Sequence, residues 1–206
     1  MKKYPKFKVE DHPFYENYVP EGCKYLIIGT FPTRKENRLF DFFYASKTNL
    51  MWDILPKIFG GSFKFNTDEE AVLERKTFLS KHSIGMTDML LKCYRRDNSS
   101  RDECLYPIIW NDIISLLNQH TDIHTLILTS RTPVWGALGL LKTLFLQKGI
   151  HLDDLKANSN NIYIGFFDYN KRRIKIKVPI SPSMSAHNDR KTALAELKDM
   201  YRQCFE

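Results

Sequence analysis

Tyr25-Leu26-Ile27-Ile28-Gly29-Thr30-Phe31-Pro32-Thr33 is the most informative segment of this chain. Its first five residues form a short apolar run, which is typical of a strand buried on both faces of a parallel sheet. The four residues that follow are small, polar or aromatic and include a proline, so they predict a turn at the end of that strand. The carboxyl ends of strands face the ligand crevice in an open α/β sheet. The turn 29–33 is therefore a candidate site.

A second turn of the same character lies far away in the sequence. Residues 181–188, with the sequence Ser-Pro-Ser-Met-Ser-Ala-His-Asn, also follow an apolar run. If the fold brings the two turns together, they form a site with polar groups, an aromatic wall and few charges. Such a site suits a nucleobase better than a phosphate group or a metal ion.

The spacing of apolar residues predicts strands that are separated by helices. Strands are expected at 25–29, 125–129, 162–167 and 174–178, the last two as an antiparallel hairpin around 168–171. The segment 84–90 fits a strand or a loop. Helices are expected at 49–59, 68–81, 108–118, 134–147 and 189–201, and a charged loop at 95–102. This order predicts an α/β fold, a three-layer α/β/α sandwich with a central, mostly parallel four-stranded sheet.

The length of 206 residues predicts a single domain, 1–206, with an irregular N-terminal arm over 1–22. No apolar segment follows Met1-Lys2-Lys3, so we expect no signal peptide. No apolar stretch approaches the roughly 20 residues of a membrane span, and we expect no membrane partner. We expect a monomer.

The composition favours a polyanionic partner. Lys and Arg number 31 against 24 Asp and Glu, which gives a formal net charge of +7, and aromatic residues make up 13% of the chain. Positive charge together with aromatic rings is what proteins that stack nucleic-acid bases use.

The cysteines argue against a metal centre. Cys23, Cys93, Cys104 and Cys204 form no C-x-x-C pair, which makes a structural zinc site or an iron–sulfur cluster a poor interpretation. Scattered cysteines suit a reducing compartment, so we expect a cytoplasmic protein without metal or cofactor. The phosphate-binding, zinc-protease and serine-hydrolase motifs G-x-x-x-x-G-K-[ST], H-E-x-x-H and G-x-S-x-G are also missing from the sequence.

Four blocks of sequence occur in an order that resembles a known family. The turn Gly29–Thr33 is followed by Tyr44 and by Asn49-Leu50-Met51-Trp52. The third block covers 87–102, and the fourth is the turn 181–188. Together, over roughly residues 24–200, they resemble the uracil-DNA glycosylase superfamily, most closely its branch of hypoxanthine- or double-strand-uracil-DNA glycosylases.

That branch carries G-S-x-P-[SG], Y-x-x-x-x-N-x-[FM]-W, W-D-V-L-x-x-C-x-R-x-G-S-x-D and L-P-S-T-S-P-A-N. In the third block this chain matches at Asp88, Leu90, Cys93 and Arg95, and more loosely at Asp102. In the fourth block it matches at Pro182, Ser183, Ser185 and Asn188. It departs from the family pattern at Thr30 (usually Ser), at Thr87 (usually Trp), at Ser130-Arg131 (commonly Asn-Gly) and at Ala186-His187 (Pro-Ala). We expect these departures to fall on the pocket and on the DNA-facing loop.

The resemblance implies hydrolysis of the N-glycosidic bond of a deaminated base, uracil or hypoxanthine, flipped out of DNA. It implies a catalytic role for Asn49, whose amide can hold a water or donate to the base, with Thr30 beside it. The alternative for Asn49 is a cap of the helix that begins there.

The remaining site residues follow from the same resemblance. The base pocket is expected to contain Gly29, Phe31, Pro32, Thr33, Tyr44 and Asp88. DNA is expected to contact Ser183, Met184, Ser185, His187, Asn188, Arg131 and Arg190, with Met184 as an apolar wedge between bases. The alternatives are a helix cap for Asp88, a place on the core for Met184 and an ordinary surface position for His187.

Three functions stay open at this point. The first is a DNA glycosylase that acts on a deaminated base. The second is a catalytically silent protein of the same fold that binds nucleic acid or another partner. The third is an α/β enzyme that acts on free nucleosides or other small molecules.

Overall fold

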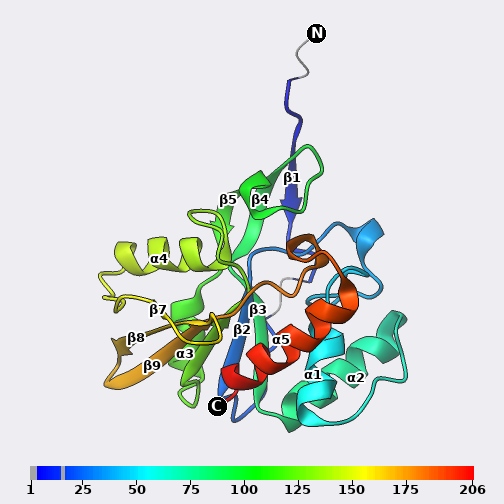
Figure 1. Cartoon of the computed structure of the whole chain (residues 1–206). Coiled ribbons are helices and arrows are strands. Elements are labelled where there is room, and N and C mark those ends of the chain that lie inside the picture. The colour runs from blue at the N-terminus through cyan, green and yellow to red at the C-terminus, as the bar shows by residue number, and fades with distance from the viewer. Residues whose placement is uncertain (1–3, 15–16) are drawn as a thin grey trace.

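A six-stranded mixed sheet forms the centre of the computed structural model, which describes residues 4–14 and 17–206 (Figure 1). The strand order is β3-β2-β6-β9-β8-β7. The strands are β2 (Tyr25–Gly29), β3 (Ile84–Asp88), β6 (Thr125–Leu128), β7 (Lys156–Ala157), β8 (Tyr163–Tyr169) and β9 (Arg172–Val178). Neighbours among β3, β2, β6 and β9 are parallel, whereas β8 and β7 join in antiparallel fashion. The predicted α/β class and the β8–β9 hairpin are confirmed.

The predicted four-stranded sheet is wrong in its strand number. The segment that fitted either a strand or a loop is β3, and β7 adds a short strand at the far edge. All five residues of β3 are buried, so the segment shows no alternation of apolar and polar residues. Pairing with β2, rather than a local pattern, makes it a strand.

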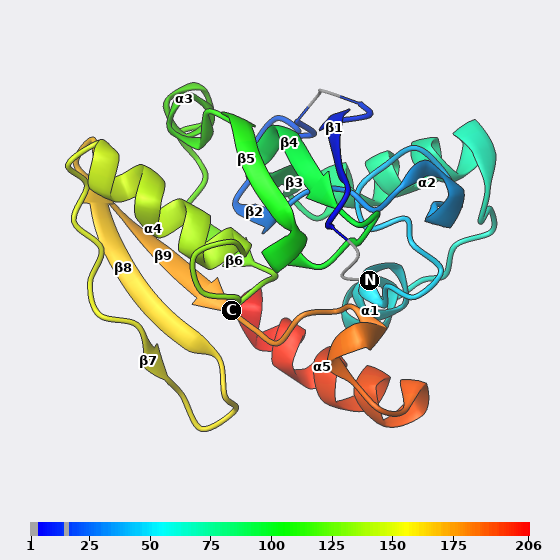
Figure 2. The ribbon, with the colours of Figure 1, turned by 90° about the horizontal axis from the view of Figure 1, so that it is seen from above.

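Helices lie against both faces of this sheet. Along β2, Leu26 and Ile28 pack into one core, and Ile27 packs into the other. The first core is covered by α3 (Ile113–Gln119) and α4 (Ala137–Gln147), and the second by α1 (Met51–Phe59), α2 (Asp68–Lys81) and α5 (Arg190–Cys204). Figure 2 shows α4 on one side of the sheet and α1 with α5 on the other. Each fully buried aliphatic side chain contributes about 1.5–3 kcal/mol.

A second, three-stranded antiparallel sheet, in the order β1-β4-β5, lies beside the first core. It consists of β1 (Phe7–Asp11), β4 (Leu90–Arg96) and β5 (Leu105–Trp110). The predicted irregular arm is therefore wrong over 7–11, while residues 1–3 and 15–16 lie outside the described part of the chain. The predicted loop 95–102 begins as the end of β4.

The predicted helix 108–118 is wrong in its first half. The chain stays extended to Trp110 because β5 pairs with β4, and the helix begins only at Ile113. The Asp112 side chain accepts a hydrogen bond from the Ser115 N–H and so caps α3.

The other helices agree with their predictions apart from shifts at their ends. Helix α2 has the predicted bounds, α1 begins at Met51, α4 begins at Ala137, and α5 continues to Cys204. Asp189 caps α5 by accepting from the Thr192 N–H at 2.7 Å. The described part of the chain also forms the short 3₁₀ turns η1 (Lys35–Asn37), η2 (Asp102–Cys104) and η3 (Met184–Ala186). Across residues 4–14 and 17–206, none of the helices is both long and apolar enough to traverse a bilayer.

Candidate functional site

The two turns identified in the sequence help to line one pocket. Asn49, just before α1, forms an isolated antiparallel bridge with Ser183 of the second turn. Beside it, the Leu50 N–H donates to the Pro182 carbonyl at 2.8 Å, and a second backbone hydrogen bond of 2.8 Å joins the same two loops. The contact is therefore made by the backbone and does not depend on side-chain rotamers.

The pocket at this junction has a volume of about 180 Å³. It lies at the carboxyl ends of β2, β3 and β6. The predicted site residues that line it are Gly29, Thr30, Phe31, Pro32, Thr33, Tyr44, Asn49, Asp88 and Ser183. Met184, Ser185, His187, Asn188, Arg131 and Arg190 do not line it.

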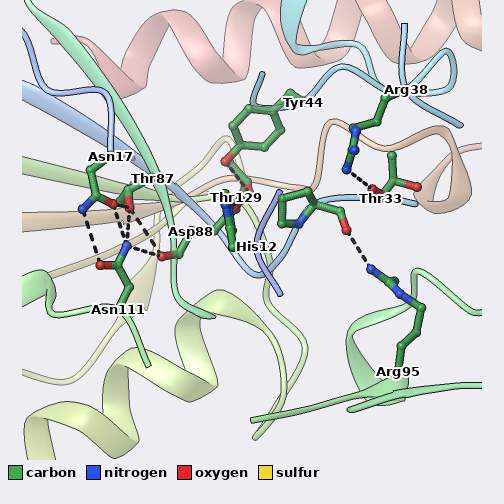
Figure 3. A network of polar contacts seen from close by, with 11 residues as sticks. His12, Asn17, Thr33, Arg38, Tyr44, Thr87, Asp88, Arg95, Asn111 and Thr129 are labelled. Atoms are coloured by element: carbon green, nitrogen blue, oxygen red, sulfur yellow. Dashed lines mark hydrogen bonds and ion pairs between the residues drawn. The ribbon is translucent and has the colours of Figure 1, made fainter. Parts of the chain in front are cut away.

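Gly29 allows a carboxylate and a phenol to approach the end of β2. A Cβ atom at this position would lie 2.1 Å from Oδ1 of Asp88 and 3.1 Å from the hydroxyl of Tyr44. The Tyr44 hydroxyl in turn lies 3.1 Å from the hydroxyl of Thr129, at the end of β6 (Figure 3). Burial, with the charge of Asp88, raises the pKa of Tyr44 well above its usual value, so the phenol stays a hydrogen-bond donor.

Asp88 is held by a histidine that the sequence analysis missed. Nε2 of His12 lies 3.1 Å from Oδ2 of Asp88, and the two residues are 2% and 6% exposed (Figure 3). The rings of Phe14 and Phe31 pack edge-on against the imidazole. Since His12 lies outside the four blocks, no sequence signal marked it. The alternative for Asp88, a helix cap, is wrong, because the residue ends β3.

Asn49 contacts the start of α1 and also lines the pocket. Its Oδ1 accepts from the Met51 N–H at 2.9 Å, which satisfies a free donor at the start of α1, although the N-cap residue of this helix is Leu50. Its Nδ2 has no hydrogen-bond partner within 4–14 and 17–206, and the half-buried side chain lines the pocket. The amide nitrogen is therefore the group that stays available to a ligand.

The turn 29–33 is anchored from behind by a buried arginine. Arg95, which is labelled in Figure 3, is 1% exposed. It donates to the Pro32 carbonyl at 2.8 Å and to the Glu10 carboxylate at 2.7 Å. The Thr33 hydroxyl lies 3.0 Å from that of Ser100. These contacts fix the turn to β1 and β4 and so preorganise one wall of the pocket.

Asp102 is a second carboxylate in the pocket wall, and the sequence analysis did not assign it a role. The Ser130 hydroxyl donates to its Oδ2. Burial raises the pKa of the Asp102 carboxyl, and the hydroxyls of Ser130, Thr30 and Thr132 oppose that rise. The Thr30 hydroxyl is itself buried and makes no hydrogen bond of normal geometry to any described residue. The only sequence signal was the loose match of Asp102 at the end of the third block.

Thr87 does not line the pocket, so the expectation for that departure is wrong. The residue is fully buried, and Nδ2 of Asn111 donates to its hydroxyl at 2.7 Å and to the Asp88 carbonyl at 2.9 Å (Figure 3). The Thr87 hydroxyl donates to Oδ1 of Asn17. This polar network supports the backbone of Asp88 from the side of the small sheet.

The second turn exposes some of its predicted DNA contacts, whereas others are half-buried. The hydroxyls of Ser183 and Ser185 lie 3.0 Å apart, and Asn188 is exposed. Met184 packs partly on the second core, as its alternative stated, and its role as a wedge stays a prediction. Nε2 of His187 lies 2.9 Å from the Ser181 carbonyl.

The two predicted arginine contacts are both engaged within the protein. Arg131 donates to the Val178 carbonyl at 2.9 Å, and its guanidinium lies 4.5 Å from the centre of the Tyr163 ring. Burial lowers the pKa of Arg131, as expected for a guanidinium in a structural position. Arg190 forms an ion pair with Asp53 at 2.7 Å on the surface. Their binding to DNA stays a prediction.

A comparison of this chain with models of protein families, with curated proteins and with solved structures finds no match. The family resemblance therefore stays a prediction. No group of three or more His, Cys, Asp or Glu in the described part of the chain is arranged to hold a metal ion.

Proposed function

We propose that this protein is a DNA glycosylase that hydrolyses the N-glycosidic bond of a deaminated base, uracil or hypoxanthine, swung out of DNA. The observation that carries the proposal is the bridge between Asn49 and Ser183 at a pocket of about 180 Å³. This bridge unites the two turns on which the resemblance depends, and the resulting pocket has polar donors, aromatic rings and carboxylates.

The chemistry assigns a role to each of these groups. The bond breaks through an oxocarbenium-like sugar and leaves negative charge on the departing base. The Asp88 carboxylate, held by His12, would stabilise the sugar cation or orient the attacking water. The Tyr44 hydroxyl and the Asn49 amide nitrogen would donate hydrogen bonds to the base, where preorganised donors are most effective. The Phe31 ring would support the base after it leaves the stack.

Asp102 would contact the edge of the base and contribute to the choice of base. It lines the pocket beside Ser130. Ser130 and Arg131 stand where the family commonly carries Asn-Gly. Ser130 presents a hydroxyl, which donates to Asp102, where the family's asparagine would present an amide that both donates and accepts. This protein would therefore read the base through a different pattern of donors and acceptors.

One observation favours the alternative of a catalytically silent nucleic-acid-binding or partner-binding protein. Oδ1 of Asn49 is occupied by the Met51 N–H, so this oxygen is less free to accept from a water. In that case the pocket would bind an unpaired base without cleaving its sugar bond.

A panel of DNA duplexes that contain uracil, hypoxanthine or xanthine tests the proposal. After incubation with the protein, alkali cleaves any abasic sites, and strand breaks are counted. We expect breaks that disappear in Asn49→Ala while DNA binding is retained, with Asn160→Ala, outside the pocket, as the matched control. Binding without breaks would support the silent protein. A result with neither breaks nor binding would favour the third function, an enzyme of free nucleosides or other small molecules.

A further inference from the structure

A second hollow of about 390 Å³ adjoins the candidate pocket. Tyr44, Ala45, Ser46 and Asn49 line both of them, so the two cavities are separated by a single layer of residues. The second hollow lies over α1 and the start of the loop that follows it. Of the residues that line it, Tyr44, Asn49 and Arg190 have roles above, whereas its aromatic wall and its two lysines have none.

One wall of this hollow is aromatic and is organised by a buried arginine. Arg75, on α2, is 2% exposed, and its guanidinium lies 4.2 Å from the centre of the Phe63 ring, 5.0 Å from Phe40 and 5.8 Å from Trp52. Its Nη1 donates to the Glu74 carboxylate at 3.0 Å. Its Nε is buried and has no hydrogen-bond partner in the described residues. The rings are thereby held in place around a positive charge.

The rim of the hollow is positively charged. Lys47, Lys57 and Arg190 line it, together with one acidic residue, Asp53. Asp53 is paired with Arg190 at 2.7 Å, whereas neither lysine forms an ion pair with a residue of 4–14 or 17–206. Two exposed ammonium groups are therefore left beside an apolar wall, a combination that fits a phosphate and a base of the same strand.

We propose that this hollow holds the nucleotide next to the target base on the same strand. The inference rests on the proposed function, which it deepens by naming the form of the substrate. The neighbouring base would lie against the wall of Phe40 and Phe63, and its phosphate would lie near Lys47 and Lys57. The second hollow is larger than the candidate pocket, so it has room for a base and part of its sugar.

The proposal has a direct consequence for the substrate. A neighbour that enters the hollow must itself be unstacked and unpaired, which costs a few kcal/mol in a duplex and little in a single strand. The protein should therefore act faster on single-stranded or locally melted DNA than on a fully paired duplex.

The test removes the neighbouring base without removing its phosphate. A short, fluorescein-labelled single strand carries one deoxyuridine, and the nucleotide on its 5′ or its 3′ side is replaced by a stable abasic spacer. Equilibrium binding is measured by fluorescence anisotropy for the wild type, Phe63→Ala and Lys57→Ala. Lys142→Ala, on α4 at the opposite face of the central sheet, is the matched control.

We expect the spacer on one side to weaken binding to the wild type by about 5-fold or more, as the loss of one stacked base does. Phe63→Ala should weaken binding of the intact strand by a similar factor and abolish the effect of the spacer. Lys57→Ala should weaken both strands equally and reduce the salt dependence. Because Lys57 is exposed, this variant stays informative if Phe63→Ala proves unstable.

The outcomes separate the inference from the proposed function. If the wild type excises a base but neither spacer nor variant alters binding, the second hollow is not a subsite, and the proposed function stands. If the spacer and the variants act as expected but no base is excised, the protein has the subsite but is a catalytically silent binding protein, and the proposed function fails. Equal excision rates on single-stranded and fully paired DNA would overturn the inference.

Discussion

At the scale of single residues, the side-chain oxygen of Asn49 contacts the start of α1, and its side-chain nitrogen is available to the pocket. Its oxygen accepts from the Met51 N–H, and its nitrogen has no partner in the described residues. Asn49→Asp keeps an acceptor for the cap but replaces the pocket donor with a negative charge. We expect Asn49→Asp to retain the melting temperature and to lose at least about 10-fold in single-turnover excision.

Asn49→Ala removes both functions and serves as the comparison. Loss of the cap should cost about 1 kcal/mol in the free energy of unfolding, measured by urea titration. Full excision activity in Asn49→Asp would show that the amide nitrogen has no catalytic role.

Asp102 offers a second prediction at this scale. Burial raises the pKa of its carboxyl above the ordinary 3.8, so ionisation of this group opposes folding at neutral pH. Asp102→Asn, which can still accept from Ser130, should increase the free energy of unfolding at about pH 7. This advantage should shrink as the pH falls and disappear below 3.8, because the carboxyl is then protonated in both states.

Asp102→Asn also tests whether this residue contributes to the choice between uracil and hypoxanthine. Because an amide presents a donor where the carboxylate presents only acceptors, the ratio of uracil to hypoxanthine excision should change by about 10-fold or more. An unchanged ratio, together with an unchanged pH dependence of stability, would remove Asp102 from the site.

At the scale of the elements, β1 connects the small sheet to the pocket. It carries Glu10, which holds Arg95, and the residue after it is His12, which holds Asp88. We expect His12→Leu to lower the free energy of unfolding by about 1–3 kcal/mol, because Asp88 loses its buried donor. Chemical denaturation measures the change, and the exposed His151, replaced by Leu, is the control. Equal stability of the two variants would contradict this role of β1.

The elements also show what the sequence could and could not predict. Apolar runs identified β2 and β6, whose residues are almost all buried, and the β8–β9 hairpin, which is only partly buried. Strand β1 was not predicted because its side chains are largely exposed. It is a strand only through pairing with β4, which lies far along the chain.

The same limit applies to the candidate site. The two turns, Tyr44 and Asp88 were found because each matches a short motif, and the structure places them around one pocket. His12 and Asp102 were not assigned to the site, since their roles depend on contacts with Asp88 and Ser130 that no local pattern encodes.

At the scale of the whole molecule, the buried cysteines link stability to high pH. All four thiols are buried. Burial raises the pKa of Cys23 to about 12, of Cys93 to about 11 and of Cys204 to about 12, against an ordinary value of 9.0. Thiols ionise at a lower pH in the unfolded chain than in the folded protein. The free energy of unfolding should therefore fall as the pH rises above 9.0. Urea titrations of the wild type and of Cys93→Ala over this pH range measure the change. We expect the free energy of unfolding to fall less steeply in Cys93→Ala. A flat profile in the wild type would contradict the prediction.

The net charge of +7 leads to a prediction about the partner. If the protein neutralises several phosphates, the logarithm of its DNA-binding constant should fall linearly with the logarithm of salt concentration, with a slope of about −0.7 to −0.9 per phosphate. Anisotropy titrations at several salt concentrations give this slope. Binding that is insensitive to salt would argue against DNA as the partner.

We propose that a swung-out nucleobase binds where the two remote loops meet and that its bond to the sugar is cut there. Chromatographic detection of the free base, after incubation of the wild type and Asn49→Asp with DNA that contains uracil, hypoxanthine or xanthine, tests it most directly. We expect release of at least one of these bases by the wild type and a strong reduction in Asn49→Asp. Release of no base from any of these substrates, by a wild-type protein that is folded and binds the DNA, would contradict it.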